Sequence, residues 1–303
     1  WGHLSVLIGG IVLLGTLAVV GVNRRDLRGQ TTRVSLVDRL RANPMTKKIV
    51  DRLAGSARVS RIWIKTASEN QGILIVVAYV MFLMMGLLIG PMYTFIDETL
   101  VSLTDAFPEE LLALFGGGDM STPEGFYQIE TFGVMAPIAF MVVTVLIGAR
   151  ALAGEEANRT MGLLLANPIK RSSVVLEKTL AMIVQAAVVA VALVAGVVGG
   201  SIIGGLGMSP MNIAATTLLG MLIGRVFGAL ALAISAATGR TRGAVFGTIG
   251  AALALYLANG FLPFSDGLEG LARLSPFHYY LSSDPLLTGM NWGHAAVLLS
   301  LFG

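Results

Sequence analysis

Two adjacent carboxylates and an arginine stand together in the polar stretch GEEANRTMGLLLANPIKR, residues 154–171, which lies between two apolar segments. Glu155 and Glu156 can exchange protons and Arg159 can stabilise negative charge, so general acid–base catalysis is one possible chemistry. The neighbouring leucines suggest another role, because a charged and partly apolar connection can dock against a partner protein. The choice depends on the elements that hold this stretch and on the side of the membrane that it faces.

Catalysis finds little support in the rest of the chain. Intramembrane glutamic proteases carry the pattern E-E-x-x-x-R, but Arg159 comes one residue too early, which turns it by about 100° on a helix. The three histidines lack an acidic partner at suitable spacing, and the chain contains no cysteine. No stretch matches G-x-x-x-x-G-K-S/T, the loop that binds nucleotide phosphates. We therefore expect no catalytic site, metal site or cofactor in this chain.

The composition is typical of a membrane protein. Hydrophobic residues make up 55% of the 303 residues, charged residues only 13%, and the mean hydropathy is +0.78. A helix needs about 20 mostly apolar residues to cross the hydrocarbon core. Segments that satisfy this are 2–22, 72–95, 132–149, 179–204, 214–237 and 244–263, and a seventh begins near Trp292. The predicted fold is an all-α polytopic membrane bundle.

Positive charge is distributed unevenly between alternate loops. Loops 23–71, 150–178 and 238–243 contain nineteen of the twenty-one lysines and arginines, whereas the intervening loops contain only Arg273. Basic loops remain in the cytoplasm, so these three are predicted to be cytoplasmic and the start of the chain to lie outside. The protein is expected in the cytoplasmic membrane, and the charge pattern argues against nucleic-acid binding.

The two ends of the chain have a motif in common. Trp-Gly-His opens an apolar run at Trp1 and again at Trp292. We interpret the chain as part of a longer protein with two copies of a six-helix unit. Residues 1–29 are then the last helix of the first copy, 30–71 a basic cytoplasmic linker with interface helices, and 72–303 the second copy with a truncated sixth helix.

Residues 43–70 combine basic and apolar side chains at helical spacing. Arg58, Arg61 and Lys65 alternate with apolar residues around Trp63. Such helices lie in the inner membrane interface, where each basic residue gains about 1 kcal/mol from anionic lipid. Membrane lipid is therefore an expected partner. A solvated linker is the alternative interpretation, and it fits residues 23–42 better.

Two outer segments carry further local signals. A helix start at Ser121 or Thr122 is expected to lead into the span at 132. The aromatic group FHYY at 277–280 is typical of an aromatic belt at the headgroup level, and a ligand site is the alternative.

Arg225 is the one basic residue inside a predicted span, about eleven residues from either end. A charge near the bilayer centre costs at least about 3 kcal/mol, so Arg225 should face the bundle interior or a cavity. Lining a substrate cleft and a structural contact with Gln185 or a backbone carbonyl remain alternatives. We take Arg225, Glu130 and Gln185 as candidate residues of a substrate pathway.

The stretch from Arg150 to Lys178 closely resembles the region between the second and third helices of ABC-2 type transporter permeases. The pattern of that family is G-E-E-x-x-G-T-x-x-x-L-L-x-x-P-x-x-R. The matching residues are Gly154, Glu155, Glu156, Thr160, Leu164, Leu165, Pro168 and Arg171. Segments 23–29, 115–137 with Glu130, 235–243 and 274–293 are also similar to that family. Arg159 and Gly162 depart from the pattern, which has Gly and an acid there.

The resemblance implies that residues 154–171 form a cytoplasmic coupling helix, which receives motion from a separate ABC ATPase. The matching residues, Arg159 included, would then transmit force, and Thr241 and Arg242 would make a second contact. It also implies a type V exporter-like fold, two ATPase copies that bind Mg-ATP, and efflux of a hydrophobic or amphipathic substrate. Exporters of antibiotics such as bacitracin or tetronasin belong to this broad group, and lipid-like cargo is equally compatible.

The alternative function is an ATPase-independent secondary transporter or a membrane scaffold. Secondary carriers usually place acids within their spans to bind coupling ions. None of the predicted spans contains a deep Asp or Glu, so the permease interpretation is preferred.

Overall fold

The computed structural model describes residues 62–95, 119–157, 171–264 and 267–301, with Gly117 and a few positions between 40 and 47. The chain divides into two compact units, Trp1–Leu53 and Ala54–Gly303. The description below concerns the second unit. The predicted span at 2–22 and the domain 1–29 lie outside the described residues.

The described part of the second unit is helical and contains no strand. It begins with α4 (Ile62–Glu69) and α5 (Gln71–Phe82), and continues with α9 (Met135–Arg150) and the short α10 (Ala153–Ala157). Three long helices follow: α12 (Arg171–Gly204), α13 (Pro210–Thr238) and α14 (Thr241–Phe261). Within the residues that the structure describes, five segments are long and apolar enough to cross a membrane: Gln71–Phe95, Pro123–Arg150, Ser172–Gly204, Pro210–Thr238 and Thr241–Phe264. The all-α polytopic prediction is confirmed.

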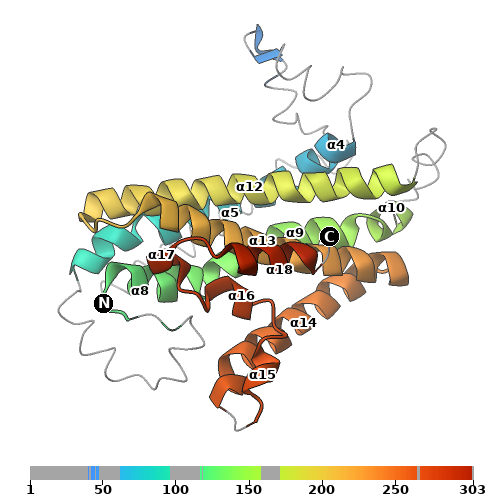
Figure 1. Cartoon of the computed structure of the whole chain (residues 1–303). Helices are drawn as coiled ribbons and strands as arrows, with labels where there is room; N and C mark the ends of the chain where they lie inside the picture. The colour runs from blue at the N-terminus through green and yellow to red at the C-terminus, as the bar shows by residue number, and fades with distance from the viewer. Residues whose placement is uncertain are drawn as a thin grey trace, which may run out of the picture. The chain divides into compact units, whose positions relative to one another are not determined.

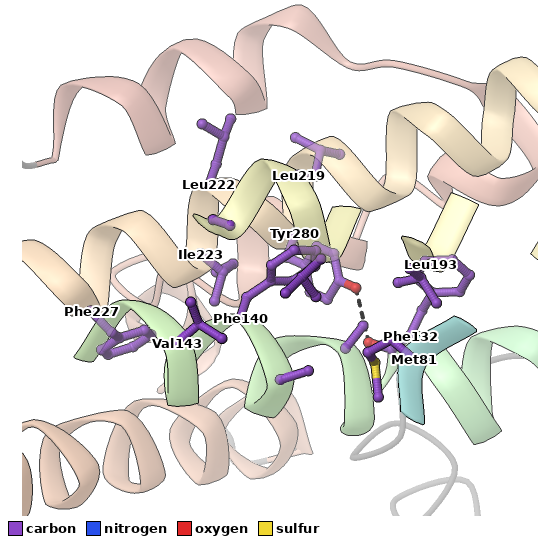
Figure 2. Packing of buried hydrophobic residues seen from close by; sticks show 14 of the residues in the cluster. Met81, Phe132, Phe140, Val143, Leu193, Leu219, Leu222, Ile223, Phe227 and Tyr280 are labelled. Carbon is purple, nitrogen blue, oxygen red and sulfur yellow. Dashed lines mark hydrogen bonds between the residues drawn. The ribbon is translucent and has the colours of Figure 1, made fainter. Parts of the chain in front are cut away.

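Among the described elements, α9 and α13 form the most extensive contact, and α12 packs against both (Figure 1). Phe140 and Val143 of α9 lie beside Ile223 and Phe227 of α13 in a core where each is almost fully buried (Figure 2). Because lipid tails are as apolar as these side chains, close packing rather than removal from water must hold this pair together. Both contacting helices therefore depend on small residues at their crossing.

The second span begins earlier than its apolar run suggests. Thr122 is the N-cap of α8 (Pro123–Tyr127), and its hydroxyl accepts the N–H of Gly125 at 3.1 Å. The π-helix η2 (Gln128–Phe132) then leads into α9. The helix start expected at Ser121 or Thr122 is confirmed, with Thr122 as the cap, and the helical segment is longer than the apolar run at 132–149 alone. Glu130 lies within this helical segment, about two turns after its first residue, Pro123.

A second π-helix, η1 (Leu83–Leu87), interrupts the first span and contacts η2. A π turn leaves carbonyl groups without their usual helical partner. The hydroxyl of Tyr127 donates to the carbonyl of Gly86 at 2.8 Å, and that of Thr131 donates to the carbonyl of Met85 at 2.7 Å. Two side chains, one from η2 and one from the end of α8, thus satisfy backbone groups of η1.

Residues 264–291, expected as a loop, contain three short helices: α15 (Glu269–Ala272), α16 (His278–Leu281) and α17 (Pro285–Thr288). The aromatic group at 277–280 does not form a belt throughout, because Phe277 and Tyr280 are buried in the core. The Tyr280 hydroxyl donates to the carbonyl of Phe132 at 3.0 Å (Figure 2). Helix α18 (Trp292–Ser300) begins where the seventh span was predicted.

We predict that Gly148→Ala destabilises the bundle, because a Cβ there would fall well inside contact distance of the Gly228 backbone oxygen. Overpacking of this kind costs about 1–3 kcal/mol. The measurement is the midpoint of thermal unfolding in detergent. Gly250→Ala is the matched control, since Gly250 lies in α14 with open space around it. Equal midpoints for the two variants would contradict this account of the α9–α13 crossing.

Candidate functional site

One end of the bundle gathers α10, the start of α12, the end of α13 and the start of α14; we call it the α10 end. Glu155 is buried there, and its Oε1 lies 2.8 Å from the Nζ of Lys178 on α12. The exposed fractions are only 4% for the lysine side chain and 11% for the carboxylate. Losing either partner of a buried ion pair leaves the other charge buried and uncompensated, which is strongly destabilising. The carboxylate of Glu155 therefore fastens α10 to α12.

Ser235 of α13 fastens the other side of the same region. Its hydroxyl donates to the carbonyl of Ala149 at 2.8 Å and accepts the N–H of Ala153 at 3.2 Å. These two backbone groups flank the break between α9 and α10, where regular helical bonding stops. One buried hydroxyl thus closes the joint and attaches it to α13.

Glu156 faces the next connection. Unlike Glu155 it is exposed. Its Oε2 lies next to Gly239, 3.1 Å from the position that a Cβ atom would occupy at that glycine. Gly239 ends α13 with φ +62, a left-handed conformation that suits glycine. Thr241 and Arg242 follow in the first turn of α14, so residues of both expected ATPase contacts lie at the α10 end.

Helix α4 joins this region through α12. The backbone N–H of Trp63 donates to the Glu177 carboxylate at 3.2 Å, and Nε2 of Gln185 donates to the carbonyl of Ala67 at 2.8 Å. Ile64 is buried against the bundle whereas Lys65 is half exposed. The amphipathic pattern of this segment thus has its apolar side on a neighbouring helix.

Arg225 lies at the middle of α13 and reaches α18. Its Nη1 donates to the carbonyl of Leu299 at 3.0 Å. Arg225 also lines a cavity of only about 10 Å³ with Thr144, Met182 and Met221. A space of this size cannot admit a drug-sized molecule. The contact with a backbone carbonyl is the structural alternative named above, whereas Gln185 contacts α4 instead.

A groove of about 480 Å³ lies between α9 and α14. Its surface is apolar and formed by residues 133–146 of the second span, 245–256 of α14, and Phe277. Figure 1 shows α14 leaning away from α9 towards α15. Volumes of 300–1,000 Å³ are typical of small-molecule pockets. The groove can hold an apolar molecule of that size.

Several residues of the sequence-predicted sites fall outside the described part of the chain. They are Arg58, Arg61, Arg159, Thr160, Leu164, Leu165 and Pro168. Arg171 begins α12, and Gly154 lies within α10. No group of three His, Asp or Glu residues suited to a metal ion occurs among the residues described.

Sequence reasoning missed three residues that organise the α10 end: Glu177, Lys178 and Ser235. Lys178 was counted only as a positive charge of a loop. Its spacing of twenty-three residues from Glu155 carries no local signal, because the partners meet only when α10 and α12 pack. Ser235 within an apolar helix gave a weak hint, since hydroxyls in spans bond to backbone groups.

Comparison with known proteins gives one match. The family model described as ABC-2 family transporter protein matches residues 65–277, which is well over half of the chain. No curated protein and no solved structure shows a significant match.

We predict that Lys178→Met lowers stability strongly, by about 3–5 kcal/mol, because it leaves the Glu155 carboxylate buried without its cation. The measurement is again the thermal midpoint in detergent. Adding Glu155→Leu to this variant should restore most of the loss. Lys65→Met is the control, because the Lys65–Glu69 pair is exposed and such pairs contribute less than about 1 kcal/mol. A Lys178 variant as stable as the Lys65 variant would refute the fastening role.

Proposed function

The chain belongs to the ABC-2 transporter family, whose members are multi-pass membrane permeases that work with an ABC ATPase. We propose that this permease exports a hydrophobic or amphipathic molecule. The observation that carries this proposal is the apolar groove between α9 and α14. A molecule that partitions into lipid would enter such a groove without being desolvated. Drugs, antibiotics and lipid-like compounds all satisfy this requirement.

The ATPase is proposed to bind at the α10 end, in the cytoplasm. There Glu156 and Ala157 are exposed, while Glu155 is buried in its ion pair with Lys178. Residues 154–171 would form the coupling helix, with the exposed residues in contact with the ATPase and Glu155 holding the helix to the bundle. Thr241 and Arg242 would make the second contact. Mg-ATP would bind in the ATPase, and this chain would supply no cofactor of its own.

A tandem arrangement is proposed for the whole transporter. The family match over residues 65–277 supports one six-helix unit there, and residues 72–303 would be the second such unit, after a basic linker. Residues 1–29 would be the last helix of the first unit, with the chain start outside the cytoplasmic membrane. Two such units would bind two ATPase copies. The alternative of an ATPase-independent carrier or scaffold is disfavoured, because the family implies an ABC ATPase partner.

Sidedness can be tested directly, because the sequence contains no cysteine. We expect Ala157→Cys to react with a membrane-impermeant maleimide in inside-out vesicles and to stay unlabelled in intact cells. Met211→Cys, which is 77% exposed at the opposite end of α13, should show the reverse pattern. Labelling of Ala157→Cys in intact cells would overturn the ATPase-docking proposal.

Export through the groove can be tested with the assembled permease and ATPase in nanodiscs. We expect one or more compounds of a hydrophobic drug and lipid panel to stimulate ATP hydrolysis, and Ile249→Trp to remove this stimulation by filling the groove. Phe246→Trp is the matched control, since Phe246 is exposed on α14 but does not line the groove. If Ile249→Trp kept full stimulation, the groove would not be the substrate site.

A further inference from the structure

The groove between α9 and α14 has a charged group beyond one of its ends. Glu130 lies in η2, one turn before Gly133 and Val134, which line the groove. Residues 130, 134, 138, 142 and 146 are exposed or half-exposed, whereas most of their neighbours are buried. Four members of this stripe line the groove. Glu130 is the fifth member and continues the stripe towards α8.

Glu130 lies just inside the outer edge of the hydrocarbon when its span is placed across the membrane. The span Pro123–Arg150 has 28 residues, or about 42 Å of helix at 1.5 Å per residue, against about 30 Å of hydrocarbon. With the span placed symmetrically, Glu130 lies about 10 Å from the start of the helix and about 4 Å inside the hydrocarbon. Acids at such positions usually face a partner or a water-filled cavity.

Glu130 has no such partner within the part of the chain that the structure describes. Its side chain is exposed and makes no hydrogen bond or ion pair with the described residues. Three other described acids lie towards the same end and add negative charge: Asp119, Glu124 and Asp284. Among the described residues of the connecting segments at that end, the basic one is Arg273. The local field therefore favours a cation.

From this placement we propose that Glu130 selects the substrate: the transporter takes amphipathic cations, whose apolar body occupies the groove while a cationic centre meets the carboxylate. This inference rests on the proposed export function and names its substrate class. A molecule of this kind satisfies both observations at once, because an apolar body matches the groove surface and its charge compensates a carboxylate held within the membrane. A neutral or anionic molecule satisfies only the first.

The experiment compares two ions of nearly equal size and shape and opposite charge, tetraphenylphosphonium and tetraphenylborate. Equilibrium binding is measured on the full-length protein in nanodiscs, with empty nanodiscs subtracted. We expect Glu130→Gln to weaken phosphonium binding about fivefold, which is the contribution of one partly solvated ion pair, and not to weaken borate binding. Glu130→Asp should keep most of the affinity for the cation.

Two control variants separate this inference from the proposed function. Glu124→Gln removes a carboxylate of α8, six residues earlier, and should weaken phosphonium binding much less than Glu130→Gln does, because Glu124 contributes only to the general negative field. Ile249→Trp should weaken both ions, because it fills the groove. If Ile249→Trp weakens both ions but Glu130→Gln changes neither, the groove binds apolar molecules and the role of Glu130 is overturned. If Ile249→Trp has no effect, or if phosphonium does not bind above the empty nanodiscs, the groove assignment and the inference fall together.

Discussion

The close approach of α9 and α13 is the constraint on which the rest of the bundle depends. Gly148 and Gly228 leave room for the two backbones to meet, and the hydroxyl of Thr144 crosses the gap to the carbonyl of Gly224 at 2.6 Å. In lipid, contact of this kind replaces the hydrophobic effect as the source of cohesion. Helix α12 packs on both of them, and α14, α17 and α18 pack against α13.

Backbone carbonyls are the common acceptors in this structure. Tyr127, Thr131 and Tyr280 donate to carbonyls of the π-helical segments, and Arg225 donates to α18. A polar side chain within the membrane has no water to bond, so a neighbouring carbonyl is its nearest partner. The same rule explains why α4 is tied to α12 through Gln185. Glu130 cannot follow this rule, since a carboxylate has no proton to donate when it is ionised.

The sequence predicted the class of fold and most spans, because long apolar runs and alternating loop charge are strong local signals. It predicted the start of α18. For the N-cap of α8 it offered Ser121 or Thr122, and the cap is Thr122. It missed the extent of the second span, because Glu124 and Glu130 interrupt the apolar run. It also missed the pairing of Glu155 with Lys178 and the burial of Tyr280, since both depend on contacts between segments distant in sequence. The groove was equally invisible, because it exists only through the angle between α9 and α14.

The joint at Ser235 has a mechanical consequence. A short helix that continues from a longer one through a break would normally swivel about that break. Here the hydroxyl of Ser235 bonds both sides of it, and the Glu155–Lys178 pair clamps the far side. Helix α10 is therefore bonded to α9, α12 and α13, so a force on α10 moves these three helices together and does not bend a hinge.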